Sequence, residues 1–123
     1  MLKAQHIFAF LFVFFTAALL YGVFRPEPPP ELFAHSDKAG HVLIFFAVAL
    51  SGRLAGISLP DWSYWPLWAS LAMTLEYLQG MLRPLRIFSI EDAYANLTGV
   101  VAALVVWLVI SRVLQGLVLQ NNG

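Results

Sequence analysis

Residues 4–24 read AQHIFAFLFVFFTAALLYGVF, and this apolar stretch sets the class of the fold. At about 1.5 Å per residue, a helix of this length crosses the roughly 30 Å hydrocarbon core of a bilayer. The stretch is longer than the apolar core of a secretory signal, which covers about 7–15 residues before a cleavage site of small residues. The sequence therefore predicts an uncleaved membrane-spanning helix at residues 4–24.

The composition of the whole chain indicates an integral membrane protein. Of its 123 residues, 60% are hydrophobic and only 11% are charged, which exceeds the usual apolar content of a soluble domain. Seven basic residues balance seven acidic ones, so no basic surface is available for nucleic acid, and we expect no nucleic-acid partner. The absence of cysteine excludes disulfides, thiolate catalysis and cysteine-type zinc sites.

Three further apolar segments complete the predicted all-α fold, a polytopic four-transmembrane-helix bundle formed by a single domain over residues 1–123: residues 38–56, 66–82 and 92–111. Residues 25–31 read RPEPPPE and form a loop, because proline lacks the amide donor of a helix and clashes with the preceding turn. The aromatic residues of segment 62–68 are typical of a belt at a membrane surface. We expect residues 115–123 to fray.

Polar side chains are predicted to meet at one face of this bundle. Because short loops join the four helices, successive helices run in opposite directions, and the ends of the first and third lie beside the starts of the second and fourth. An ionisable group inside a membrane helix costs roughly 2.5–3.5 kcal/mol, so we expect His41 and Glu76 to face partners rather than lipid. The predicted ligand-binding residues are Asp37, Lys38, His41, Glu76, Gln79, Arg86, Asp92 and Asn96.

The other polar residues carry less information about function. The opposite face holds Lys3, Arg53, Asp61 and Arg112, to which we assign no site. In the fourth helix, small residues recur every four positions and predict a close approach of another helix: Ala95, Gly99 and Ala103.

The reaction chemistry is weakly indicated. The chain has no Gly-x-Ser-x-Gly elbow, no His-Glu-x-x-His and no glycine-rich phosphate loop. His41, Glu76 and Asp92 are the candidate catalytic residues, but three ligands scattered over three helices are a weak metal signal, so we predict no metal and no cofactor. The favoured ligand is an amphiphile whose phosphate or sugar headgroup lies near Lys38 and Arg86.

A purely structural interpretation accounts for the same residues. Asp37 and Asp92 would cap helices, and Asn96 would join helices. Glu76 would be the buried partner of Arg86. Under this alternative the bundle binds no ligand.

Four sequence blocks resemble the successive motifs of VanZ-like membrane proteins. They are DKAGH at residues 37–41, EYLQ at 76–79, RIFSIED at 86–92 and DAYANLTG at 92–99. Leu85 departs from the family pattern, in which a small residue is common before the arginine. The resemblance implies a helical bundle in a bacterial cell envelope, in a family named for glycopeptide (teicoplanin) resistance, and it also marks Gly99 as a motif position.

The orientation follows from the basic residues near the helix ends. With Lys38 and Arg86 set aside as site residues, the positive-inside rule favours both termini in the cytoplasm, so that the polar layer lies at the outward-facing side of the bacterial inner (cytoplasmic) membrane. We expect the polar layer to engage a membrane lipid or a lipid-linked cell-wall precursor, with a link to cell-wall or glycopeptide-antibiotic response. The alternatives are a membrane enzyme acting on a lipid phosphate or lipid-linked sugar, with His41 or Glu76 as acid and base, and a structural or partner-binding bundle. The sequence does not indicate the oligomeric state.

Overall fold

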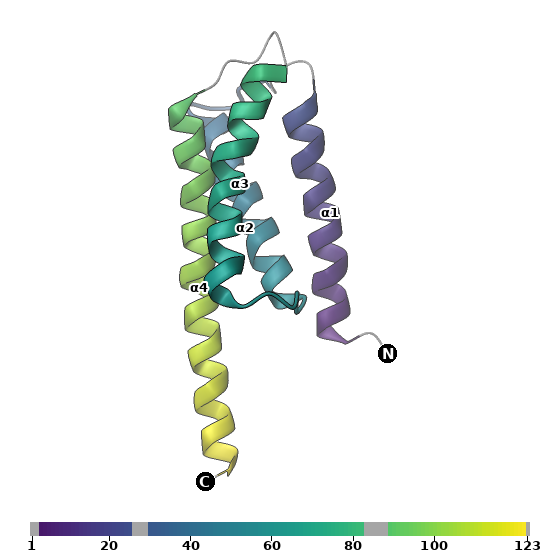
Figure 1. The fold of residues 1–123 in the computed structure, drawn as a ribbon, viewed down its shortest axis with the longest axis vertical. Helices are drawn as coiled ribbons and strands as arrows, with labels where there is room; N and C mark the ends of the chain where they lie inside the picture. Colours follow the sequence, from purple (N-terminus) through teal and green to yellow (C-terminus); the bar gives the residue numbers. More distant parts are fainter. Residues whose placement is uncertain (1–2, 26–29, 83–88, 123) are drawn as a thin grey trace.

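The computed structural model describes residues 3–25, 30–82 and 89–122. These residues form four helices and no strand, which confirms the predicted all-α class. The helices are α1 (Ala4–Phe24), α2 (Ser36–Leu54), α3 (Asp61–Leu82) and α4 (Ile90–Asn122). Successive helices run in opposite directions, so both chain termini lie at one end of the bundle (Figure 1), here called the termini end. The opposite end, where α2 and α4 begin, is the far end.

Two of the four helices, α1 and α4, are long and apolar enough to cross a membrane. Their apolar side chains are largely exposed, as Phe10, Val13 and Phe14 illustrate on α1. Exposed apolar side chains in this number suit contact with a membrane or with another protein. Among the described helices, α2 and α3 are not apolar enough to be recognised as membrane-spanning by length and composition alone.

The first two helices lie close to their predicted positions. Helix α1 covers residues 4–24 as expected, whereas α2 covers Ser36–Leu54 rather than 38–56. Gly56 has a φ of +81° and follows the end of α2, a backbone conformation that glycine adopts without a steric penalty. The Gln5 side chain donates a hydrogen bond of 3.1 Å to the Ala55 carbonyl and so joins α1 to this turn.

The last two helices are longer than predicted. Helix α3 begins at Asp61 rather than at residue 66, and Trp65 Nε1 holds the added turn by donating to Asp61 Oδ1 at 3.3 Å. Helix α4 continues to Asn122 rather than ending at residue 111, so the expected fraying of its tail is wrong for residues 115–122. Gly116 is the weakest helix former in that tail, and a single glycine costs only about 1 kcal/mol relative to alanine.

Helix α4 packs closely against α2 through the predicted ridge of small residues. Ala95, Gly99 and Ala103 are all buried. A Cβ added at Gly99 would overlap the Val42 carbonyl oxygen and lie 3.0 Å from the Phe46 amide nitrogen. Only glycine therefore allows the two backbones to approach this closely, and this contact positions the start of α4 beside α2.

The aromatic residues of segment 62–68 form part of the core rather than a surface belt. Tyr64, Trp65 and Trp68 are buried, and only Trp62 is largely exposed, at 80%. The Tyr64 hydroxyl donates to the Ala49 carbonyl of α2 at 2.5 Å. The predicted belt is therefore wrong for three of these four residues, because α3 turns them toward α1 and α2.

Candidate functional site

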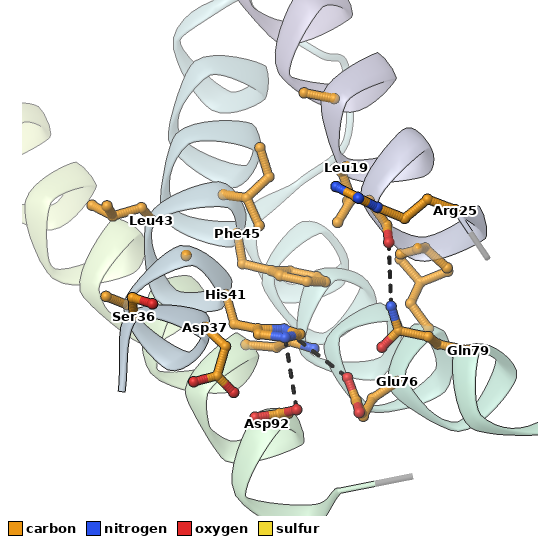
Figure 2. Close-up of a pocket in the computed structure, with 18 of the residues that line it drawn as sticks. Leu19, Arg25, Ser36, Asp37, His41, Leu43, Phe45, Glu76, Gln79 and Asp92 are labelled. Atoms are coloured by element: carbon orange, nitrogen blue, oxygen red, sulfur yellow. Dashed lines mark hydrogen bonds and ion pairs between the residues drawn. The ribbon is translucent and has the colours of Figure 1, made fainter. Parts of the chain in front are cut away.

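A cavity of about 730 Å³ lies at the far end of the bundle and is lined by residues from all four helices (Figure 2). Its apolar lining includes Leu19, Val23, Leu43, Ile44, Phe45 and Leu75. Its polar lining includes Asp37, His41, Glu76, Gln79, Asp92 and Asn96. The cavity thus combines apolar walls with a polar floor, as a pocket for an amphiphilic molecule does.

His41 occupies the centre of the polar floor and receives its orientation from Asn96. The Asn96 amide nitrogen donates to the Ala72 carbonyl at 3.0 Å, so the amide oxygen faces His41 Nδ1, 2.6 Å away. Because that oxygen only accepts, Nδ1 carries a hydrogen. Asn96 therefore fixes both the position of the imidazole ring and the nitrogen that bears the proton.

Two carboxylates from different helices flank the imidazole ring. Asp92 Oδ2 on α4 lies 3.8 Å from His41 Nε2, and Glu76 Oε2 on α3 lies 4.0 Å from Nδ1. The Glu76 side chain is 1% exposed, and its Oε1 accepts a hydrogen bond of 3.4 Å from the Ser89 amide. The structure therefore brings the three candidate catalytic residues into one cluster, here called the histidine cluster: His41, Glu76, Asp92 and Asn96.

The structural alternative assigned helix-capping roles to Asp37 and Asp92, and neither residue stands at an N-cap position. Ser89 precedes α4, and its hydroxyl accepts a hydrogen bond from the Asp92 amide at 3.2 Å. The N-cap position of α2 is His35, without a side-chain capping bond. Neither Asp37 nor Asp92 caps its helix, whereas Asn96 does join helices, as that alternative expected.

Lys38 is shared among three carboxylates. Its ammonium lies 3.5 Å from Asp37, 3.6 Å from Glu91 and 3.5 Å from Asp92 Oδ1. Partial burial raises the pKa of Asp37, but Lys38 and backbone N–H groups outweigh burial and lower it overall. The positive charge of Lys38 is thus largely compensated within the protein, which weakens its expected role as a binder of anions.

Of the remaining predicted residues, one lies at the cavity and one falls outside the part of the chain that the structure describes. Gln79 lines the cavity and donates to the Gly22 carbonyl at 3.3 Å, which joins α3 to α1. Arg86 lies outside the described residues. Sequence analysis missed the cavity wall that α1 provides and missed Arg25, which directly follows α1 and also lines the cavity. The Arg25 guanidinium lies 5.8 Å from the centre of the Tyr21 ring. Arg25 follows an apolar run, and in the sequence it is indistinguishable from an ordinary charge at a membrane boundary.

A second polar cluster lies at the termini end, where we had assigned no site. Arg53 Nη1 donates to the Leu59 carbonyl at 2.7 Å, and Nε lies 3.4 Å from Asp61. The guanidinium also lies over the rings of Tyr64 and Trp107, 4.9 and 5.5 Å from their centres. We call this group the arginine cluster: Arg53, Asp61, Tyr64, Trp65 and Trp107. It joins α2, α3 and α4.

The histidine cluster has the chemistry of a proton-transfer or ligand-binding site. An imidazole between two carboxylates can accept, hold or pass on a proton, and nitrogen and carboxylate oxygen are also ligands for divalent cations. No family model, curated protein or solved structure matches the chain. The VanZ-like resemblance therefore stays a prediction, and function has to be argued from the cavity and its polar floor.

Proposed function

We propose that the chain is a VanZ-like membrane protein of the bacterial inner membrane that binds the headgroup of a lipid or lipid-linked molecule in the far-end cavity. All four helices would span the membrane, with both termini in the cytoplasm. The observation that carries the proposal is the cavity, whose apolar walls suit an acyl or isoprenoid chain and whose polar floor suits a headgroup.

The position of the motif residues supports this proposal. Six of the eight predicted ligand-binding residues line one cavity, although they come from three separate helices. Helix association alone needs only occasional polar contacts. A buried carboxylate, an imidazole and two amides beside one space are more than packing requires, which favours recognition of a ligand.

The proposal also explains the surface of the bundle. The largely exposed apolar side chains of α1 and α4 would be covered by lipid. A lipid molecule would then reach the cavity from the membrane itself, with its chain along α1 and α2. Handling of surface lipids or cell-wall precursors follows as the biological context.

A cavity-filling substitution tests the proposal. Gly40 lines the cavity, and a Cβ added there meets no atom within 4 Å, so Gly40→Leu should fold while taking up ligand space. Gly116 also has nothing within 4 Å and lies far along α4, which makes Gly116→Leu a matched control. The measurement is the melting temperature in detergent, with and without phosphatidylglycerol or a polyprenyl phosphate.

We expect wild type and Gly116→Leu to gain stability with one of these lipids, because a ligand that binds only the folded state raises its stability. Gly40→Leu should fold and lose most of that gain. An equal lipid response in both variants, or no lipid response in wild type, would contradict the proposal. A gain with only one of the two probes identifies the class of headgroup.

One observation favours an enzyme as the second candidate. The hydrogen bond from Nδ1 to Asn96 fixes the tautomer of the neutral imidazole and leaves the lone pair on Nε2, beside Asp92 in the cavity, as a general base requires. Turnover of a lipid phosphate by the purified protein, abolished in Glu76→Gln, would distinguish this candidate from binding alone.

A further inference from the structure

The geometry around His41 contains an arrangement that hydrogen bonds do not explain. Because Nδ1 donates to Asn96, the neutral ring presents the lone pair of Nε2 toward Asp92 Oδ2, 3.8 Å away. With a neutral ring and an ionised carboxylate both atoms are acceptors, and at 3.8 Å they make no hydrogen bond. Asp92 Oδ1 is paired with Lys38 Nζ, 3.5 Å away, so Oδ2 is the carboxylate oxygen that faces the ring. Positive charge between Nε2 and Asp92 would resolve this arrangement.

We propose that His41, Glu76 and Asp92 form a binding site for a divalent cation such as Zn²⁺ or Mn²⁺. One ligand atom from each residue lies within 4.8 Å of the other two. Around a tetrahedral Zn²⁺ with bonds of about 2.0–2.2 Å, ligand atoms lie about 3.4 Å apart. The three side chains therefore need only a small inward rotation to share one ion.

The donor set indicates the kind of ion. Imidazole nitrogen favours Zn²⁺ and related transition metals, and carboxylate oxygen favours Mn²⁺ and Mg²⁺. One nitrogen with two carboxylate oxygens suits an ion that accepts both, which Zn²⁺ and Mn²⁺ do. Mg²⁺ and Ca²⁺ prefer sites built from oxygen alone.

The residues behind this triad have the arrangement found around bound metals. A ligating histidine usually donates its second N–H to a carbonyl or carboxylate, which orients the ring. Asn96 Oδ1 accepts that hydrogen from Nδ1, and the amide nitrogen of Asn96 donates to the Ala72 carbonyl, which holds the side chain in place. Lys38 contacts Asp92 through Oδ1, whereas Oδ2 is the atom that faces the ring.

The cation would also account for the charge of the cavity. Among its described lining residues, Asp37, Glu76 and Asp92 are acidic and Arg25 is basic, a poor balance for binding a phosphate. Three protein ligands leave open coordination positions on a metal. If the proposed function holds, a phosphate oxygen of the headgroup would occupy one of these positions.

Metal binding by the purified full chain tests this inference. The protein in detergent is treated with EDTA, exchanged into metal-free buffer and titrated with Mn²⁺, with bound ion followed by electron paramagnetic resonance, and then with Zn²⁺ by calorimetry. His41→Asn keeps an N–H donor for Asn96 and removes Nε2, and Asp92→Asn preserves shape. Glu91→Gln is the matched control, because Glu91 contacts the same Lys38, is exposed and is not one of the triad.

Wild type and Glu91→Gln should bind about one ion per chain, and both site variants should bind at least about tenfold more weakly. Melting temperatures without metal check that each variant folds. If a site variant does not fold, Glu76→Gln takes its place. Absence of binding in wild type, or equal affinity in folded site variants, overturns the cation site and leaves imidazolium as the positive charge beside Asp92.

The lipid response, measured with Mn²⁺ and with EDTA, separates this inference from the proposed function. Cation binding without any lipid response supports the cation site and overturns the lipid proposal. A lipid response that persists in EDTA, in a protein that binds no cation, overturns the cation site and keeps the lipid proposal. A lipid response that requires Mn²⁺ supports both.

Discussion

At the termini end, Arg53 contacts Asp61, the Leu59 carbonyl and the rings of Tyr64 and Trp107, whereas at the far end His41 and Asp92 face each other beside a cavity. Both clusters join α2, α3 and α4. In the arginine cluster, Arg53 Nη1 donates to a backbone carbonyl, the guanidinium lies beside the Asp61 carboxylate and over two aromatic rings, and Nε makes no hydrogen bond with any described residue. In the histidine cluster, His41 Nε2 and Asp92 Oδ2 lie 3.8 Å apart, beyond hydrogen-bond distance, beside an open cavity.

This difference separates a stabilising role from a binding role. A charge that is paired within the protein contributes to stability and offers little to a ligand. A polar group that is positioned by its neighbours but lacks a matching partner is suited to bind something else. Substitutions at the arginine cluster should therefore affect stability, and those at the histidine cluster should affect ligand response.

The largest expected effect comes from the contact on which both clusters depend. Gly99→Val should lower the free energy of unfolding by about 3 kcal/mol, the upper part of the range for overpacking, because its side chain would collide with the α2 backbone. Helix α4 carries Asp92 and Trp107, so both clusters would separate. Thermal unfolding in detergent measures this, and unchanged stability would show that α4 does not need to pack so closely on α2.

An intermediate effect is expected at the arginine cluster. Arg53→Ala removes a charged hydrogen bond and two ring contacts, which should cost about 2 kcal/mol. The lipid and cation responses should stay as in wild type, because the cavity lies at the other end. The exposed Arg112 provides the control, since Arg112→Ala removes a basic residue of α4 without this network. Loss of lipid response in a folded Arg53→Ala protein would contradict the division between the clusters.

The smallest expected effect is a pH dependence at Asp37. Its pKa is lowered in the folded protein, so its contribution to stability is present above the unfolded pKa and is lost as the pH falls through the folded pKa. Asp37→Asn should therefore destabilise the protein at pH 7, by no more than about 0.5 kcal/mol, and have a smaller effect near pH 3. Melting curves at the two pH values measure the difference. An equal loss at both would mean that the Asp37 charge is not responsible.

Much of the fold was predictable because it follows from short-range patterns. The apolar stretch at residues 4–24 and the small residues around Gly99 predicted a helix and a close helix contact, and both are present. The boundaries of α3 and α4 were less predictable. The first turn of α3 depends on the Trp65–Asp61 bond, and α4 continues because nothing in its tail breaks a helix strongly enough.

The sequence predicted which residues form the candidate site, but not the distances between them. Alternating helix directions place His41, Glu76 and Asp92 near one face, whatever the packing. Their separations depend on helix rotation and tilt, which a sequence of this kind does not specify. The same limit explains why Arg53 and Asp61 were passed over, since their connection runs through the Tyr64 and Trp107 rings of two other helices.

From the sequence follow the all-α class, the helical segments and the residues that are too polar for their surroundings. These properties depend on composition and on the spacing of residues along the chain, and they do not depend on how the helices pack. Only the packed bundle shows which nitrogen of His41 donates to Asn96 and which oxygen of Asp92 faces the ring. It also shows that carboxylates offset the charge of Lys38 and that a cavity lies beside these residues. Each of these needs atoms from at least two helices placed to within a few tenths of an ångström, which only the packing of the bundle provides.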